Sequence, residues 1–246
     1  MEAQVKKTEK RQKILKLILN CALLLIWVFA ANIASQFIIA YPMYWILGDN
    51  IKLPVWTAVY SALAYTLALA LIVFVPWKVF KKWKTNREEL GLIGWPTWTD
   101  LGLAPIGFIA SLIAAYILTA IFSFFPWFNV NETQNVGFNF LISGGDRVIA
   151  FITLVIIAPI AEEIIFRGWL YGKLRAKLSM PIAMILTSLL FGILHGQWNV
   201  GVNVFALSIV LCGLREVTGT IYSGIVTHMI KNAVAFFLLY VMNVGI

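Results

Sequence analysis

The stretch LILNCALLLIWVFAANIASQFIIA, residues 17–40, decides the fold class. It contains no Asp, Glu, Lys or Arg, and it is longer than the roughly 20 apolar residues that an α-helix needs to cross a bilayer. A secretory signal, in contrast, has an apolar core of only about 7–15 residues. We therefore predict a retained membrane-spanning helix, because a helix satisfies its backbone polar groups without water.

The rest of the chain has the same character. Hydrophobic residues make up 61% of the sequence and charged residues 12%, and the mean hydropathy is +0.87, whereas soluble domains are about half apolar and a quarter charged. Further apolar segments occupy residues 54–77, 101–125, 147–178, 181–197, 200–214 and 218–244. The sequence thus predicts an all-α, polytopic transmembrane helical bundle of about seven to eight spans, with residues 1–246 forming a single integral membrane domain.

The net charge of +8 gathers in clusters beside the apolar segments rather than in a separate domain. Lys and Arg precede the first segment at residues 6–16, follow the second at 78–87, and follow the fourth at 173–177. All three clusters fall on one side of the membrane if the spans alternate, and basic loops favour the cytoplasmic side. We expect a multi-pass protein of the bacterial cytoplasmic membrane with its N-terminus inside, in contact with membrane lipids and not with nucleic acid.

The second basic cluster belongs to a longer connector. Residues 78–100, KVFKKWKTNREELGLIGWPTWTD, interleave Trp and Leu with charge. Basic amphipathic segments of this kind commonly lie along a membrane surface. We predict that arrangement for the connector.

Several polar and ionisable residues lie within the apolar segments of the second half. They are Glu162 and Glu163 in APIAEEIIFRGWLYGKL, His195 in LLFGILHGQWN, and His228 with Asn232 in GIVTHMIKNAVAF. An ionisable group costs about 2.5–3.5 kcal/mol to insert at the centre of a membrane helix, so each is a candidate functional residue. The chain has only two histidines, and both belong to this set.

Helical spacing separates the two glutamates. Residues four apart share a helix face, whereas neighbours point about 100° apart. Glu163 therefore faces Arg167, and Glu162 lies on a different face without a local cation. We predict that Glu163 and Arg167 form a supporting pair and that Glu162 is free to act as a general base.

The same spacing places Phe191 on the face of His195, and His228 on the face of Asn232. If the three helices converge, Glu162 and His195 can bind and deprotonate a water molecule. His228 and Asn232 can then stabilise an oxyanion. Each element also has a structural alternative: a buried ion pair, a packed core histidine, or a polar contact between helices.

Other peptidase chemistries find less support in the sequence. It contains no HExxH, the usual zinc-binding pattern of a helix. Residues 143–146, Ser-Gly-Gly-Asp, are similar to an aspartyl-protease motif, but Ser143 replaces the first glycine of that motif. No other span contains a partner aspartate. Ser223 and His228 are five residues apart on one helix, a poor spacing for a nucleophile and its base.

Taken together, the three patterns resemble those of the CAAX protease and bacteriocin-processing family, also called CPBP or Abi. These patterns are Glu-Glu-x-x-x-Arg at 162–167, Phe-x-x-x-His at 191–195 and His-x-x-x-Asn at 228–232. They occur in the family's order on separate predicted helices. The resemblance covers roughly residues 149–237, within a motif-bearing core of residues 147–244, and the first three spans match only in being hydrophobic.

The resemblance implies an intramembrane endopeptidase of the type II CAAX prenyl endopeptidase kind, acting on a peptide or membrane-protein substrate. It makes Glu162 the base, His195 its water-binding partner, and His228 and Asn232 the oxyanion stabilisers. Glu163, Arg167 and Phe191 become supporting residues.

The cofactor and the activity leave alternatives open. No metal is firmly expected, but a divalent ion such as zinc has three candidate ligands in Glu162, His195 and His228. Two functions compete with the peptidase. One is a non-catalytic peptide-binding or bacteriocin-immunity membrane protein, and the other is a proton-coupled transporter, although no repeated halves are apparent.

Overall fold

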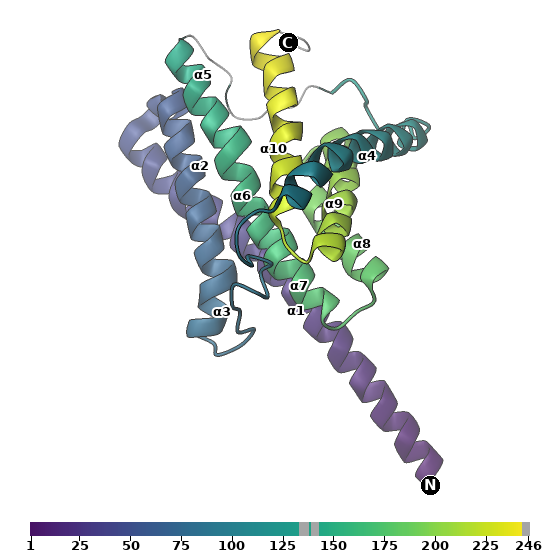
Figure 1. The fold of residues 1–246 in the computed structure, drawn as a ribbon. Coiled ribbons are helices and arrows are strands. Elements are labelled where there is room, and N and C mark those ends of the chain that lie inside the picture. Colours follow the sequence, from purple (N-terminus) through teal and green to yellow (C-terminus); the bar gives the residue numbers. More distant parts are fainter. Residues whose placement is uncertain (133–137, 139–142, 243–246) are drawn as a thin grey trace.

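The computed structural model describes residues 1–132, 138 and 143–242, and within these ranges the regular structure is helical throughout (Figure 1). The first half of the chain comprises α1 (Glu2–Leu47), the 3₁₀ turn η1 (Gly48–Lys52), α2 (Pro54–Leu69), the π-helical η2 (Ala70–Phe74), α3 (Val75–Lys78) and α4 (Trp98–Phe122). The second half comprises α5 (Gly144–Phe151), η3 (Ile152–Ile157), α6 (Ala158–Glu163), η4 (Ile164–Tyr171), α7 (Gly172–Arg175), α8 (Met180–Ile193), α9 (Trp198–Thr218), α10 (Tyr222–Phe236) and η5 (Phe237–Val241), of which η3, η4 and η5 are π-helical.

Six helical stretches are long and apolar enough to cross a membrane, and α8 is a shorter apolar helix. They are Gln4–Lys52, Pro54–Lys78, Trp98–Phe122, Gly144–Arg175, Trp198–Thr218 and Tyr222–Tyr240. The predicted all-α, multi-pass architecture is confirmed. Each of the seven predicted segments corresponds to one of these helices, and the described part of the chain holds no eighth.

The helix that carries His195 ends earlier than predicted. The sequence suggested a helix over residues 181–197, but α8 ends at Ile193, and His195 lies in the turn before α9. Gly196 has a φ of 72°, a left-handed conformation that glycine adopts without steric cost and that ends helices. The turn therefore presents His195 from the end of a helix rather than from its side.

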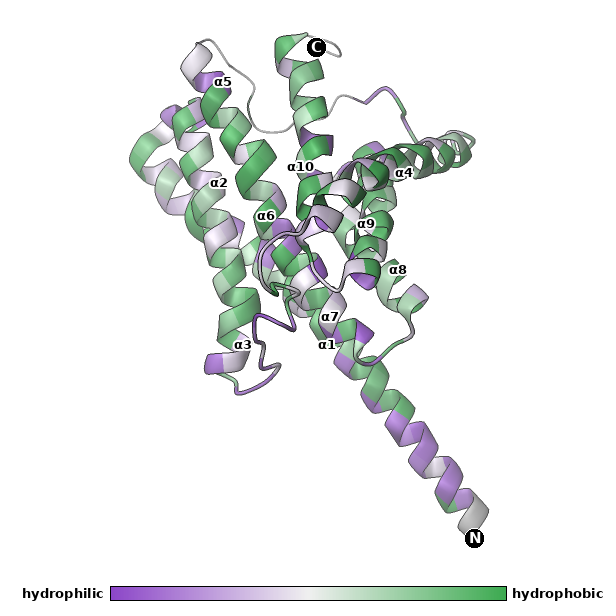
Figure 2. Ribbon diagram, in the orientation of Figure 1, coloured by the Kyte–Doolittle hydropathy of each residue, from purple (hydrophilic) through white to green (hydrophobic). Residues whose placement is uncertain are grey.

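The three basic clusters lie at one end of the molecule. The start of α1, the end of α3 and the region of α7 share this end, and the first turns of α1 project beyond the bundle as a hydrophilic helix (Figure 2). This arrangement agrees with the alternation of spans that the sequence predicted.

The connector between α3 and α4, which the sequence predicts to lie along the membrane surface, contains no regular helix. Residues 79–97 are turns and irregular chain, and Leu90 is buried. The amide of Ile221 donates to the carbonyl of Gly91 at 3.1 Å, which joins the connector to the start of α10. Part of the segment thus packs against the protein, because its apolar residues find partners in the bundle.

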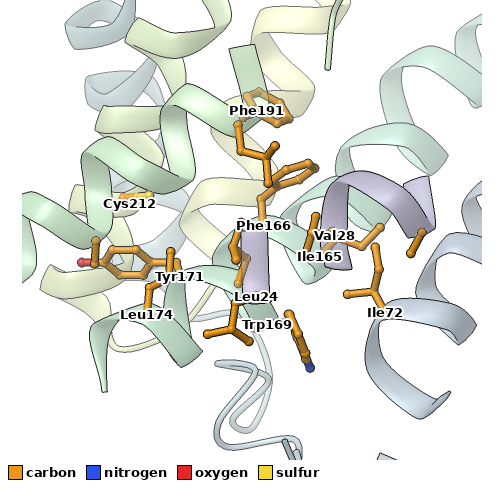
Figure 3. Packing of buried hydrophobic residues seen from close by; sticks show 14 of the residues in the cluster. Leu24, Val28, Ile72, Ile165, Phe166, Trp169, Tyr171, Leu174, Phe191 and Cys212 are labelled. Carbon is orange, nitrogen blue, oxygen red and sulfur yellow. The ribbon is translucent and has the colours of Figure 1, made fainter. Parts of the chain in front are cut away.

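The largest hydrophobic core holds the motif-bearing helix against the first two spans. Trp169 and Phe166 of η4 are buried beside Leu24 of α1 and Ile72 of η2 (Figure 3). Phe166 also meets Phe191 of α8 edge to face, with ring centroids 4.8 Å apart. The aromatic residues of η4 therefore fix the helix that carries both glutamates.

This helix is not a regular α-helix along its length. Pro159 lies near the start of α6 and lacks the N–H that would bond to the preceding turn. The π-helical η3 immediately precedes it, and η4 immediately follows Glu163. Wide turns of this kind are rare and often occur at functional sites, where they change the direction of the following side chains.

Candidate active site

Glu163 is the buried centre of a three-residue cluster. Its Oε1 accepts a hydrogen bond from Nη1 of Arg167 at 2.8 Å and lies 3.0 Å from Nδ1 of His228. The side chains of Glu163 and Arg167 are fully buried. The predicted i, i+4 pair is thus formed, and the structure adds a contact from α10 to it.

A glycine of α10 makes this approach possible. A Cβ on Gly224 would lie 3.1 Å from Oε2 of Glu163, closer than about nine in ten real Cβ contacts. The absence of a side chain at Gly224 lets α10 approach the carboxylate, and so brings His228 within hydrogen-bonding distance.

Glu162 has different surroundings from its neighbour. Its side chain is 16% exposed and lines two cavities, of about 280 and 200 Å³. Its Oε1 accepts a hydrogen bond from the hydroxyl of Tyr65 in α2 at 2.7 Å. The carboxylate of Glu163 is therefore enclosed by its partners, whereas that of Glu162 faces the cavities.

His195 borders the same two cavities as Glu162. Its Nδ1 lies 2.8 Å from the carbonyl oxygen of Phe191, whose ring it also contacts edge to face at a centroid distance of 4.9 Å. When Nδ1 donates to this carbonyl, the neutral ring carries a lone pair on Nε2. The predicted Phe191 support is present, and it sets both the orientation and the tautomer of the imidazole.

His228 and Asn232 line the smaller cavity from α10. Nε2 of His228 is 3.7 Å from Oε2 of Glu162, which is beyond hydrogen-bonding distance. Nδ2 of Asn232 donates to the carbonyl of Leu154 in η3 at 2.9 Å. Since an amide nitrogen carries two hydrogens, this bond holds the side chain and leaves one donor for another acceptor.

Two residues near Glu162 were not found from the sequence. Tyr65 is separated from Glu162 by 97 positions, and a tyrosine in an apolar segment carries no signal of its partner. Lys231 lines the smaller cavity beside His228 and Asn232. Its charge within an apolar segment was a usable signal, because ionisable residues within spans mark functional regions.

Arg215 of α9 stabilises the π-helical η4 from outside the cavity. Its guanidinium donates to the carbonyls of Arg167 and Gly168, and also to that of Glu89 in the connector at 2.6 Å. A π-helix leaves carbonyls without their regular partners, and the guanidinium supplies five donors in a planar fork. Arg215 thus joins the connector to the helix that carries the site.

The Ser-Gly-Gly-Asp stretch has a structural role. The hydroxyl of Ser143 accepts from the amide of Asp146 at 3.1 Å, and the carboxylate of Asp146 accepts from the amide of Ser143 at 2.9 Å. This reciprocal pair is a capping box that begins α5.

The residues proposed as zinc ligands are not arranged as a metal site. His228 directs its two ring nitrogens toward the carboxylates of Glu163 and Glu162. Within the described residues, no three His, Cys, Asp or Glu side chains are grouped so as to hold a metal ion. Glu162, His195 and His228 therefore form no such group among the described residues.

Comparison with known proteins identifies one family. Residues 144–234 match the family model of the type II CAAX prenyl endopeptidase Rce1-like proteins. No curated protein and no solved structure matches the chain. The match extends from the first residue of α5 into α10 and includes every predicted site residue, so the resemblance inferred from the three patterns is confirmed. Residues 144–234 of this membrane protein are therefore similar to the Rce1-like type II CAAX prenyl endopeptidases.

Proposed function

We propose that the protein is an intramembrane endopeptidase in which Glu162 and His195 activate a water molecule. The observation that carries this proposal is the contrast between the two neighbouring glutamates. Glu163 is bound on the buried side by Arg167 and His228, whereas Glu162 faces a cavity together with His195. Of the two carboxylates, Glu162 is the one that a water molecule and a peptide can reach.

In the proposed reaction, a water molecule binds between the carboxylate of Glu162 and Nε2 of His195. Glu162 accepts one proton as the water oxygen attacks the peptide carbonyl carbon, and a tetrahedral oxyanion forms. The free amide hydrogen of Asn232 is proposed to stabilise the oxyanion. His228 is proposed to assist in the form that carries hydrogen on both ring nitrogens, in which Nδ1 donates to Glu163 and Nε2 can donate to the oxyanion. Glu162 then returns the proton to the leaving amine as the C–N bond breaks, which leaves a carboxylate and a new amino terminus.

Tyr65 completes this arrangement from α2. Its hydroxyl donates to Oε1 of Glu162, so it holds the carboxylate in one orientation and leaves Oε2 toward His228. A positioned base is more effective than a mobile one, because the reacting groups are already aligned.

The proposed substrate is a membrane-associated protein of the CAAX or bacteriocin type, in which one peptide bond is cleaved. The proposed location of the enzyme is a bacterial cytoplasmic membrane, with the N-terminus of the enzyme on the inner side. The basic clusters at one end of the molecule support this orientation. The reaction uses side chains and water alone, so activity is expected to survive treatment with a metal chelator.

The test compares new peptide termini in membranes that contain the wild-type protein or the Glu162→Gln variant at equal expression. Glu9→Gln is the matched control, because it makes the same change on the exposed start of α1. Termini present with the wild type and the control but absent with Glu162→Gln would establish proteolysis and identify the substrates. Identical termini in all three, with the host phenotype retained by Glu162→Gln, would defeat the peptidase and favour a peptide-binding protein.

A further inference from the structure

The larger cavity beside Glu162 has a second wall that lies outside the matched residues. Asn32 and Gln36 of α1 line it, together with Glu162 and His195. The two carboxamides are four residues apart and therefore project from one face of α1. The N-terminal half, which resembled the family only in being hydrophobic, thus contributes polar groups to the site.

Neither carboxamide is used to hold the fold. Among the described residues, the side chains of Asn32 and Gln36 make no hydrogen bond, whereas the nearby hydroxyl of Ser35 bonds to the carbonyl of Asn32. An amide group without a partner is costly in an apolar medium. Two such groups in a membrane helix, facing one cavity, indicate a ligand with both donors and acceptors.

We infer that Asn32 and Gln36 bind the main chain of the substrate and hold it extended beside Glu162. This inference rests on the proposed peptidase function. Each carboxamide offers a donor and an acceptor, as does each peptide unit. The Cβ atoms of side chains one helical turn apart are about 5–6 Å apart. The N–H and C=O groups along one edge of an extended chain recur roughly every 7 Å. Flexible side chains can span this difference.

The two carboxamides also restrict the class of substrate. The N–H and C=O groups of a helical segment are already paired with each other, so a helix has nothing to offer these carboxamides. Only an unwound or intrinsically extended segment can bind them. The sequence next to the cleaved bond is therefore expected to lack stable helical structure, and side-chain identity there matters less than backbone accessibility.

Asn32 and Gln36 have an alternative role, which is to bind a chain of water molecules that supplies water to Glu162. The two roles differ in kinetics. Loss of main-chain binding raises KM, whereas loss of water supply lowers kcat without changing KM. The experiment below separates them.

The first measurement is binding without cleavage. A randomised decapeptide library carrying a benzophenone is cross-linked to the Glu162→Gln protein, with and without the added changes Asn32→Leu and Gln36→Leu. The matched control is Asn203→Leu, which removes an exposed carboxamide of α9 that does not line the cavity. Labelling is expected to fall about tenfold with the α1 changes, as two lost hydrogen bonds predict, and to stay unchanged with the control.

The second measurement uses the active protein and a peptide identified from its new termini. Asn32→Leu with Gln36→Leu is expected to raise KM about tenfold and to leave kcat unchanged. Equal labelling of all proteins, or a lower kcat at constant KM, would overturn the inference while leaving the peptidase intact. Failure of the wild type to cleave anything, with labelling still dependent on α1, would instead remove the proposed function and retain the binding surface.

Discussion

The hydroxyl of Tyr65 lies 2.7 Å from Oε1 of Glu162 and connects two parts of the chain that are 97 positions apart. Tyr65 belongs to α2, outside the residues 144–234 that match the family. The orientation of the proposed base therefore depends on the N-terminal half of the protein. A fragment that begins at residue 144 would lack this contact.

Tyr65→Phe is expected to lower kcat about tenfold to a hundredfold, because a hydrogen bond to a charged group contributes about 1.5–3 kcal/mol. KM should change little, since the hydroxyl contacts the base. The control is Tyr116→Phe, which removes the hydroxyl of an exposed tyrosine of α4. Steady-state kinetics on an identified peptide checks the prediction, and equal kcat values for the two variants would contradict it.

His195→Asn separates the two nitrogens of this histidine. The shorter amide can still donate to the carbonyl of Phe191, as Nδ1 does in the structure, but it has no atom at the position of Nε2. We expect the protein to fold and kcat to fall by about 10²–10⁴, the usual contribution of a positioned acid or base. Full activity in this variant would show that Nε2 does not bind the reacting water.

Arg167→Met is expected to destabilise the protein by about 3–5 kcal/mol, because it leaves Glu163 as a buried charge without its cation. Arg175→Met is the matched control. Arg175 pairs with Glu216 near the surface, where such pairs contribute about 0–1 kcal/mol. The stability of both variants is measured by heating them in detergent and monitoring the folded fraction by size-exclusion chromatography.

The Glu163→Gln change provides a second test of the buried pair. In combination with Arg167→Met it removes both charges, and the double variant should recover part of the stability that Arg167→Met alone loses. If the double variant loses as much stability as the two single variants lose together, the two side chains act independently.

Gly192→Ala is expected to lower the stability by about 1–3 kcal/mol. Its Cβ would lie 2.8 Å from the carbonyl oxygen of Gly201 in α9, so two backbones must move apart. In Gly213→Ala the new Cβ meets only the end of Met184, at 3.7 Å, and this control should be as stable as the wild type. The same unfolding assay decides between them, and equal stability would show that α8 and α9 separate without cost.

Because His195 follows α8 closely, Gly192→Ala is also expected to lower activity in the fraction that remains folded. A displacement of about 1 Å in a reacting group can cost roughly a hundredfold in rate. Kinetics normalised to folded protein should show a reduced kcat. Wild-type kcat in folded Gly192→Ala would indicate that the turn at His195 is independent of helix spacing.

The sequence predicted those features of the site that depend on one helix. The Glu163–Arg167 pair followed from the i, i+4 rule, because neighbours on a helix face are set by local geometry. The contact of Phe191 with His195 was predicted from the same spacing, but His195 makes it from the turn that follows α8. The end of α8 at Ile193 was missed, because the effect of Gly196 depends on its backbone conformation, which the sequence does not give.

The sequence alone determined that the chain spans a membrane as an all-α protein, because its apolar residues far exceed what a soluble domain can bury. It also determined which residues share a helix face. Only the tertiary structure decided that Tyr65 contacts Glu162 and that Asn32 faces the same cavity. These contacts join spans distant in the sequence, and the packing of helices, set by aromatic and glycine contacts across their interfaces, carries no periodic signal within any one segment.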